Sequence, residues 1–164
     1  MAASRMSANR AEEAPPAAVQ AITNLMDSPG GIRRYEEPPE PRNIIRTAVN
    51  NGVGVMGIRA VQAGALTAKI DRLMEADDPE MQDYMKAAPF RALCEELGEN
   101  PAVLAHRYAL SMEGVDTVVL GVKNRDELQE IVAAEAKGPL KADVIQAIDA
   151  LRLNFIRPKI PMEI

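Results

Sequence analysis

The hydrophobic positions of the chain follow two different patterns, and the patterns alternate along the sequence. Short apolar runs predict three strands, at residues 17–26, 52–61 and 115–120. Apolar residues three or four apart predict helices at residues 44–51, 90–97, 101–111, 125–132 and 144–155. The run at 115–120 is mostly apolar and β-branched, through Val115, Thr117, Val118, Val119 and Leu120, and predicts a strand buried on both faces. Strands that alternate with helices lie parallel, with right-handed crossovers, so the predicted class is α/β.

Glycine, proline and asparagine mark the ends of these elements. Asn51-Gly52 and Gly98 predict helix ends, and Asn100-Pro101 predicts a helix start, with a cap followed by proline in the first turn. Between the second strand and residue 88 the chain makes a detour. There the pattern predicts a helical stretch near Ala65–Met74 and a break at Asp78-Pro79.

Composition restricts the class of protein further. The chain has 164 residues, 47% of them hydrophobic, only 3% aromatic, and a net charge of −5. Such a length suits one domain, and the negative charge argues against nucleic acid or an anionic membrane as a partner. A single cysteine excludes an intramolecular disulfide, so we expect a reducing, cytoplasmic location. We expect a disordered tail at 1–16, a domain at 17–157 and an extended tail at 158–164.

The third strand leads into the most suggestive stretch for ligand binding, VDTVVLGVKNRDELQE at residues 115–130. The strand ends at Gly121, Lys123 follows, and a helix begins with Asp126 and Glu127 in its first turn. A glycine turn, a cation and a helix N-terminus together suit an anionic ligand. Taken alone, the stretch is better explained as an ordinary strand-to-helix connection with a solvated lysine.

Two segments in order resemble the aldo-keto reductase family. Residues 52–67, GVGVMGIRAVQAGALT, resemble its seventh strand and the following loop, and residues 115–132 resemble its eighth strand and cofactor loop. Residues 17–25 are similar to its sixth strand. The resemblance implies a (β/α)8 barrel that binds NADP(H) and transfers a hydride to or from a carbonyl. A closed barrel takes about 250 residues, so the predicted fold is a partial (β/α)8 TIM-type barrel with about three parallel strands and flanking helices.

The resemblance also implies roles for particular residues. Gln20 matches the residue that holds the nicotinamide carboxamide. The loop over the pyrophosphate contains Arg59, Val61 and Gly64. The strand ending at Gly121 leads to Lys123 and Asn124, which match the loop near the adenosine 2′-phosphate, while Glu127 and Ile131 fall where the helix faces the adenine.

Several positions depart from the family pattern. Ile58 stands where an aromatic residue often stacks on the nicotinamide, and Arg59 stands where serine is common. The carboxylate of Glu127 near a 2′-phosphate is unfavourable unless Lys123 or Arg125 outweighs it. NADP(H) as the cofactor rests on Lys123 and on the resemblance, and NAD is the alternative.

Catalytic residues are not evident in the sequence. The family's Asp, Tyr, Lys and His tetrad comes from its first four strands, which have no counterpart here. The single histidine, His106, falls inside a predicted helix, and Cys94 belongs to the apolar stripe of another. Tyr35 and the pair Arg33-Arg34 lie in a loop rich in proline and glycine, and no Cys/His spacing suits zinc.

Two hypotheses of different classes follow. In the first, the chain is the C-terminal part of an NADP(H)-dependent oxidoreductase, inactive alone because it lacks the tetrad. In the second, it is a non-catalytic module that binds a nucleotide or a protein and self-associates through its exposed sheet edges. In either case we expect no metal, nucleic acid or membrane partner.

Overall fold

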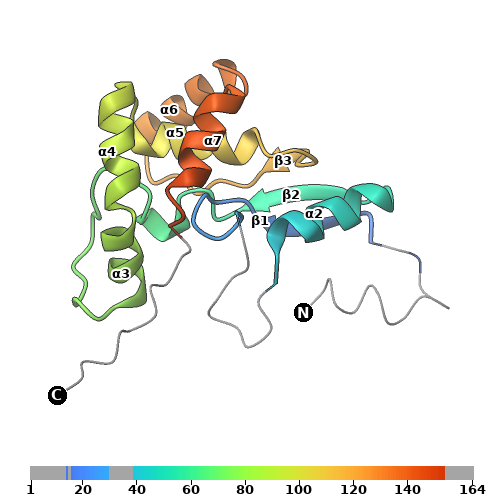
Figure 1. The fold of residues 1–164 in the computed structure, drawn as a ribbon, viewed down its shortest axis with the longest axis horizontal. Helices are drawn as coiled ribbons and strands as arrows, with labels where there is room; N and C mark the ends of the chain where they lie inside the picture. Colours follow the sequence, from blue (N-terminus) through green and yellow to red (C-terminus); the bar gives the residue numbers. More distant parts are fainter. Residues whose placement is uncertain (1–13, 15, 30–38, 154–164) are drawn as a thin grey trace.

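The computed structural model describes residues 14, 16–29 and 39–153 (Figure 1). Arg33, Arg34, Tyr35, Phe155, most of the predicted N-terminal tail and the predicted C-terminal tail lie outside these residues, and the predicted domain boundaries stay predictions. The elements run in this order: β1 (Ala18–Ile22), α2 (Pro41–Asn50), β2 (Gly54–Ile58), the 3-10 turn η1 (Gln62–Gly64), α3 (Pro79–Lys86), α4 (Ala88–Leu97), α5 (Pro101–Leu110), β3 (Thr117–Val118), α6 (Arg125–Ala136) and α7 (Ala142–Ala150).

The strands form one parallel sheet in the order β1-β2-β3. Ala18 pairs with Gly54, and Met56 pairs with Thr117. Parallel neighbours need a crossover of a dozen or more residues; α2 lies in the first crossover and α3 to α5 lie in the second. The predicted α/β class with three parallel strands is confirmed.

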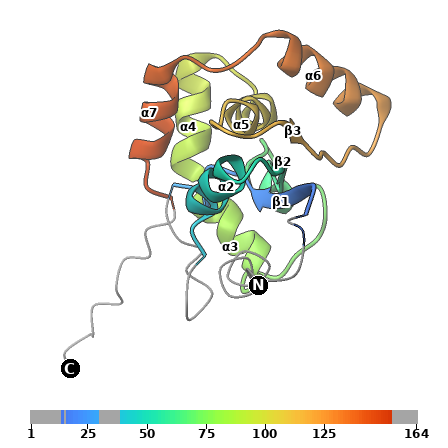
Figure 2. The same cartoon turned by 90° about the vertical axis from the view of Figure 1, so that its right-hand side faces the viewer.

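Helices α2 and α5 lie on the same side of the sheet, and α4 and α7 lie beyond α5 (Figure 2). Two hydrophobic clusters hold this arrangement. The smaller one joins the sheet to α2 through Ala21, Ile45, Ala48, Val53 and Val55. The larger one centres on Phe90 of α4 and Leu104 of α5, with Ile148 of α7 and Leu66 packed against them. Burial of these apolar side chains supplies most of the hydrophobic stabilisation.

The predicted ends around α4 and α5 are confirmed. Gly98 follows α4 in the left-handed conformation, with φ of 64°. Asn100 caps α5, because its Oδ1 accepts hydrogen bonds from the backbone N–H groups of Ala102 at 2.8 Å and Val103 at 3.4 Å. Pro101 occupies the first turn, where its missing N–H costs no hydrogen bond.

Replacing Gly98 by alanine should lower the free energy of unfolding by about 1–2 kcal/mol, the usual cost of left-handed backbone for a residue with a Cβ. A Cβ at Gly98 would meet nothing within 4 Å, so backbone conformation alone sets this cost. Gly121→Ala is the matched control, since Gly121 has equally open surroundings without positive φ. Urea denaturation measures both; an equal effect of the two substitutions would contradict the assignment.

The prediction of a helix near Ala65–Met74 is wrong, because residues 65–74 form turns and bends. Side chains take the local carbonyl groups there: Thr67 Oγ1 donates to Gly64 O at 2.8 Å, and Arg72 donates to Ala63 O at 3.0 Å. Asp78-Pro79, predicted as a break, is the start of α3. The Asp78 Oδ1 caps that helix by accepting from Glu80 N at 2.9 Å.

The burial predicted for the third strand is also wrong. Only Thr117–Val118 form β3, Thr117 is exposed, and Val119 keeps half its surface accessible. In α6, Leu128 and Val132 are exposed and Ala134 is the buried residue. The physical reason is that β3 is an edge strand and, among the helices, α6 packs mainly against α5.

Candidate functional site

An open groove of about 610 Å³ lies beyond the carboxyl ends of β2 and β3. Its volume falls within the range of about 300–1,000 Å³ that small-molecule sites occupy. Three walls form it: the loop at 59–73, the connection at 119–123, and the facing residues of α5 and α6. Four cations (Arg59, Lys69, Arg72, Lys123) and three carboxylates (Asp71, Glu127, Glu130) line it. The lining side chains therefore carry a small net positive charge.

The first wall has a strained backbone. Arg59, Gln62 and Ala63 have φ values of 61°, 46° and 53°, and Gly64 has φ of 94°. Non-glycine residues adopt such values only where the surroundings hold them, and they cluster at functional sites. This turn directs Arg59, Val61 and Gly64 to the groove.

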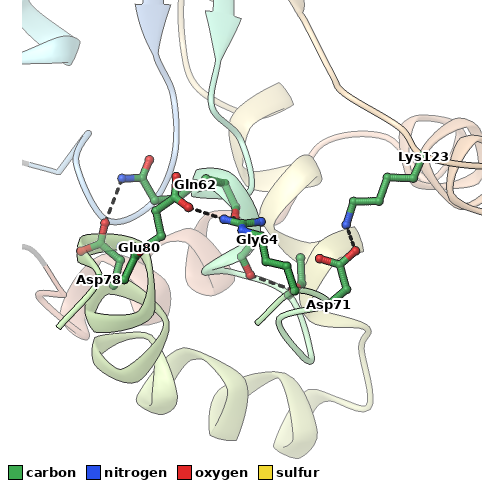
Figure 3. Close-up of polar contacts among 10 residues, drawn as sticks. Gln62, Gly64, Asp71, Asp78, Glu80 and Lys123 are labelled. Carbon is green, nitrogen blue, oxygen red and sulfur yellow. Dashed lines mark hydrogen bonds and ion pairs between the residues drawn. The ribbon is translucent and has the colours of Figure 1, made fainter. Parts of the chain in front are cut away.

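Gln62 holds this turn in place. Its side chain is buried, and its Oε1 accepts hydrogen bonds from Asn24 Nδ2 at 2.9 Å and from Arg59 Nε at 3.0 Å. Its Nε2 donates to Asp83 Oδ2 of α3 at 3.1 Å (Figure 3). One glutamine thereby links the ends of β1 and β2 to α3. Gln62 was not among the predicted site residues, because a glutamine in a loop carries no local sign of burial.

The second wall places Lys123 across the groove from Asp71. The two side chains form an ion pair and hydrogen bond that joins the 59–73 loop to the β3–α6 connection (Figure 3). This hydrogen bond from Lys123 lowers the pKa of the Asp71 carboxyl. The Lys123 backbone N–H donates to Glu127 Oε2 at 2.8 Å. Asp71 was not among the predicted site residues, since 52 positions separate it from Lys123.

The third wall is mostly apolar. Ala102, Val103 and His106 come from α5, and Ile131 comes from α6. His106 is 6% exposed, and burial lowers the pKa of its imidazole. A hydrogen bond with the Ala102 backbone raises this pKa, but by less than burial lowers it. The groove thus has a charged side near Lys123 and an apolar side along α5.

Six of the eight residues that the sequence predicted for cofactor binding line the groove: Arg59, Val61, Gly64, Gly121, Lys123 and Glu127. Asn124 lies next to it and caps α6, its Oδ1 accepting from Glu127 N at 2.9 Å. Gln20 lies in β1 with an exposed side chain and does not line the groove. Ile58 is the last residue of β2.

Other reactive side chains are held in structural roles. Tyr108 of α5 accepts a hydrogen bond from Arg42 at 2.6 Å and donates to Asp149 at 2.5 Å, which joins α2, α5 and α7. Burial raises the pKa of this tyrosine. Cys94 is buried, as predicted, and burial raises the pKa of its thiol to about 11, so it stays protonated at neutral pH.

The described residues hold neither a cluster of metal ligands nor a membrane-spanning helix. Across residues 14, 16–29 and 39–153, no three His, Cys, Asp or Glu side chains are grouped so that they could hold a metal ion. Within the same part of the chain, every helix is too short or too polar for a membrane span.

Comparison with known proteins identifies the family. The model of the Aldo/keto reductase family matches residues 2–153. The chain belongs to the aldo/keto reductase family. Among curated proteins, none matches the sequence. This family consists of oxidoreductases that generally use NAD(P)H.

Solved aldo/keto reductases share the fold. A Bacillus halodurans aldo-keto reductase in its holo form has 20% identity and a TM-score of 0.62, over 87% of this chain and 43% of that one. Its apo form has 21% identity and a TM-score of 0.63, over 94% of this chain and 49% of that one. A glycerol dehydrogenase of Gluconobacter oxydans has 21% identity and a TM-score of 0.62, over 88% of this chain and 46% of that one. The chain therefore spans less than half the length of these TIM barrels, and the predicted partial barrel is confirmed.

Proposed function

We propose that the groove binds the adenosine-phosphate end of NADP(H), as part of an oxidoreductase that acts on carbonyl or alcohol substrates. The observation that carries the proposal is the convergence of two distant loops on one groove, with Arg59 and Lys123 on its walls. Both loops follow the carboxyl ends of parallel strands, where α/β proteins commonly bind ligands. The cofactor itself would supply the hydride.

The residues present fit such a ligand in charge and shape. Lys123 would meet the 2′-phosphate, and the left-handed turn ending at Gly64 would cover the pyrophosphate. The apolar surface of Val103 and Ile131 would take the flat adenine ring. Glu127 already accepts a hydrogen bond from the Lys123 backbone, which places its carboxylate against the chain and restrains it from approaching a phosphate. Gln20 keeps its proposed nicotinamide role, at the other end of the cofactor.

We further propose that this chain does not transfer a hydride alone. The tyrosines and histidine that the structure describes support this: Tyr108 is bound to Arg42 and Asp149, Tyr84 donates to Ala68 O at 3.0 Å, and His106 lies inside α5. A general acid needs a neighbour that tunes its pKa within hydrogen-bond reach of the substrate. None of these three has a lysine and an aspartate around it in that role.

The direct test of the proposed function uses isothermal titration calorimetry. The chain should bind 2′,5′-ADP at least about tenfold more tightly than 5′-ADP, since a charge-assisted hydrogen bond contributes about 1.5–3 kcal/mol. Equal binding of the two would favour NAD, and binding of neither would refute a nucleotide site. Mixing the chain with NADPH and a panel of aldehydes should give no cofactor oxidation; turnover would refute the claim of inactivity.

Asp71 should compete with the ligand phosphate for Lys123. Replacing Asp71 by asparagine is expected to tighten 2′,5′-ADP binding only modestly, about two- to fivefold, because an exposed ion pair contributes little. Asp77→Asn is the matched control, as Asp77 is exposed in the same segment but does not line the groove. Weaker or unchanged binding by the Asp71 variant would show that the pair shapes the site instead.

A second function, self-association, is supported by exposed apolar side chains in the β3–α6 connection and on α6. Val119, Val122, Leu128 and Val132 each expose about two fifths or more of their surface. They adjoin the open edge of β3, which can pair with another strand. Light scattering should detect a dimer or larger species, whereas a stable monomer at high concentration would refute it.

A further inference from the structure

His106 has a hydrogen-bonding atom that no described residue satisfies. Its Nε2 is buried without a partner among the described residues, while the residue itself lines the groove. A buried polar atom without a hydrogen bond costs about 1–3 kcal/mol, so native proteins leave few of them. Such an atom beside a ligand-sized groove suggests that the ligand provides the missing hydrogen bond.

The chemistry of the imidazole decides which kind of group can provide it. A hydrogen bond with the Ala102 backbone raises the pKa of the His106 ring, as a bond to a carbonyl acceptor does. Because Nε2 has no partner among the described residues, Nδ1 is the ring nitrogen assigned to this bond. Burial keeps the ring neutral at pH 7, and a neutral ring carries one N–H. With the proton on Nδ1, Nε2 is an acceptor, and it requires a donor from the ligand.

The surroundings of His106 narrow the choice to a flat, mostly apolar group. Ala102 and Val103 lie one turn before His106 on α5, and Ile131 faces them from α6. Lys123 and Asp71 occupy the charged side of the same groove. A purine ring that carries an amino group, attached to a phosphorylated sugar, meets both requirements.

We propose that His106 is a specificity-determining residue, whose Nε2 accepts a hydrogen bond from the exocyclic amino group of the adenine in this groove. The inference rests on the proposed function, since it assumes a nucleotide there. It adds a reason for the choice of base: hypoxanthine has a carbonyl oxygen in place of the amino group, and two acceptors would then face each other.

The experiment compares 2′,5′-ADP with its hypoxanthine counterpart by calorimetry at pH 7.5, for the unaltered chain and for His106→Leu. The unaltered chain should prefer adenine by roughly tenfold, the upper range for one hydrogen bond. In His106→Leu, adenine binding should fall about five- to tenfold while hypoxanthine binding stays the same, so that the preference disappears. Thermal unfolding should show that this variant is as stable as the unaltered chain or more so, because it removes an unpartnered polar atom.

His106→Gln separates hydrogen bonding from packing. Its amide can accept from adenine or, after rotation, donate to hypoxanthine, so this variant should bind both ligands with similar affinity. Equal losses for both ligands in His106→Leu would overturn the proposal, because they would indicate a packing role alone. An unaltered chain that binds both bases equally would also overturn it and leave the nucleotide site intact. Binding of neither ligand would overturn the proposed function and this inference together.

Discussion

Replacing Lys123 by alanine is expected to weaken binding of 2′,5′-ADP by roughly tenfold or more, since a hydrogen bond to a charged group contributes about 1.5–3 kcal/mol. Lys123 lines the groove, and its ammonium group forms an ion pair with Asp71, which lines the same groove from another loop. Because the Lys123 side chain is 62% exposed, salt should screen its attraction for a phosphate. We therefore expect the lower end of that range at physiological salt and the upper end at low salt.

Lys137→Ala provides the matched control. Lys137 is also a surface lysine in an ion pair, with Glu99 at 3.0 Å, but it does not line the groove. Calorimetric titrations at two salt concentrations compare the variants. The role of Lys123 would be refuted if both variants bound the ligand as tightly as the unaltered chain, or if the loss were the same for 5′-ADP.

Replacing Phe90 by alanine should cause the largest loss of stability, about 3–5 kcal/mol. Phe90 has no accessible surface, and it packs in the cluster that joins α4 to α5 and α7. Truncation would remove the apolar ring and leave a cavity that helices on several sides cannot fill. Small domains are stable by only about 5–15 kcal/mol, so this substitution removes a large share of the total.

Leu73→Ala serves as the control for this substitution, because Leu73 is fully exposed. Urea denaturation followed by circular dichroism should give a much lower midpoint for Phe90→Ala and an unchanged midpoint for Leu73→Ala. Similar midpoints for the two variants would mean that α4 does not pack as described. Since Phe90 does not itself line the groove, ligand affinity measured on the folded fraction should change much less than in Lys123→Ala.

The fold was predictable wherever short-range chemistry decides the backbone. Asn100-Pro101 predicts the start of α5 because a side chain two residues away caps the helix, and Gly98 predicts the end of α4 because its conformation is local. The same logic failed at Asp78-Pro79. An Asp-Pro dipeptide is compatible both with the end of one segment and with the start of a helix. Only the structure shows that it starts α3 here.

The candidate site was predictable in part. The order of two loops along the chain indicates that Arg59 and Lys123 belong to one site, and both line the groove. Gln62, Asp71 and His106 were not identified. Gln62 accepts a hydrogen bond from Asn24, 38 positions earlier, and Asp71 pairs with Lys123, 52 positions later. Pairings of this kind leave no periodic signal.

By itself, the sequence determined the class of the fold, the parallel direction of its strands, the end of α4 and the start of α5, because these follow from side-chain period and from contacts within a few residues. Only the tertiary structure decided which surfaces are covered. Leu128 and Val132 have the spacing of buried residues, yet they are exposed because α6 packs mainly against α5 and leaves this face uncovered. It also decided that His106 faces the groove, since burial depends on what the rest of the chain brings to α5.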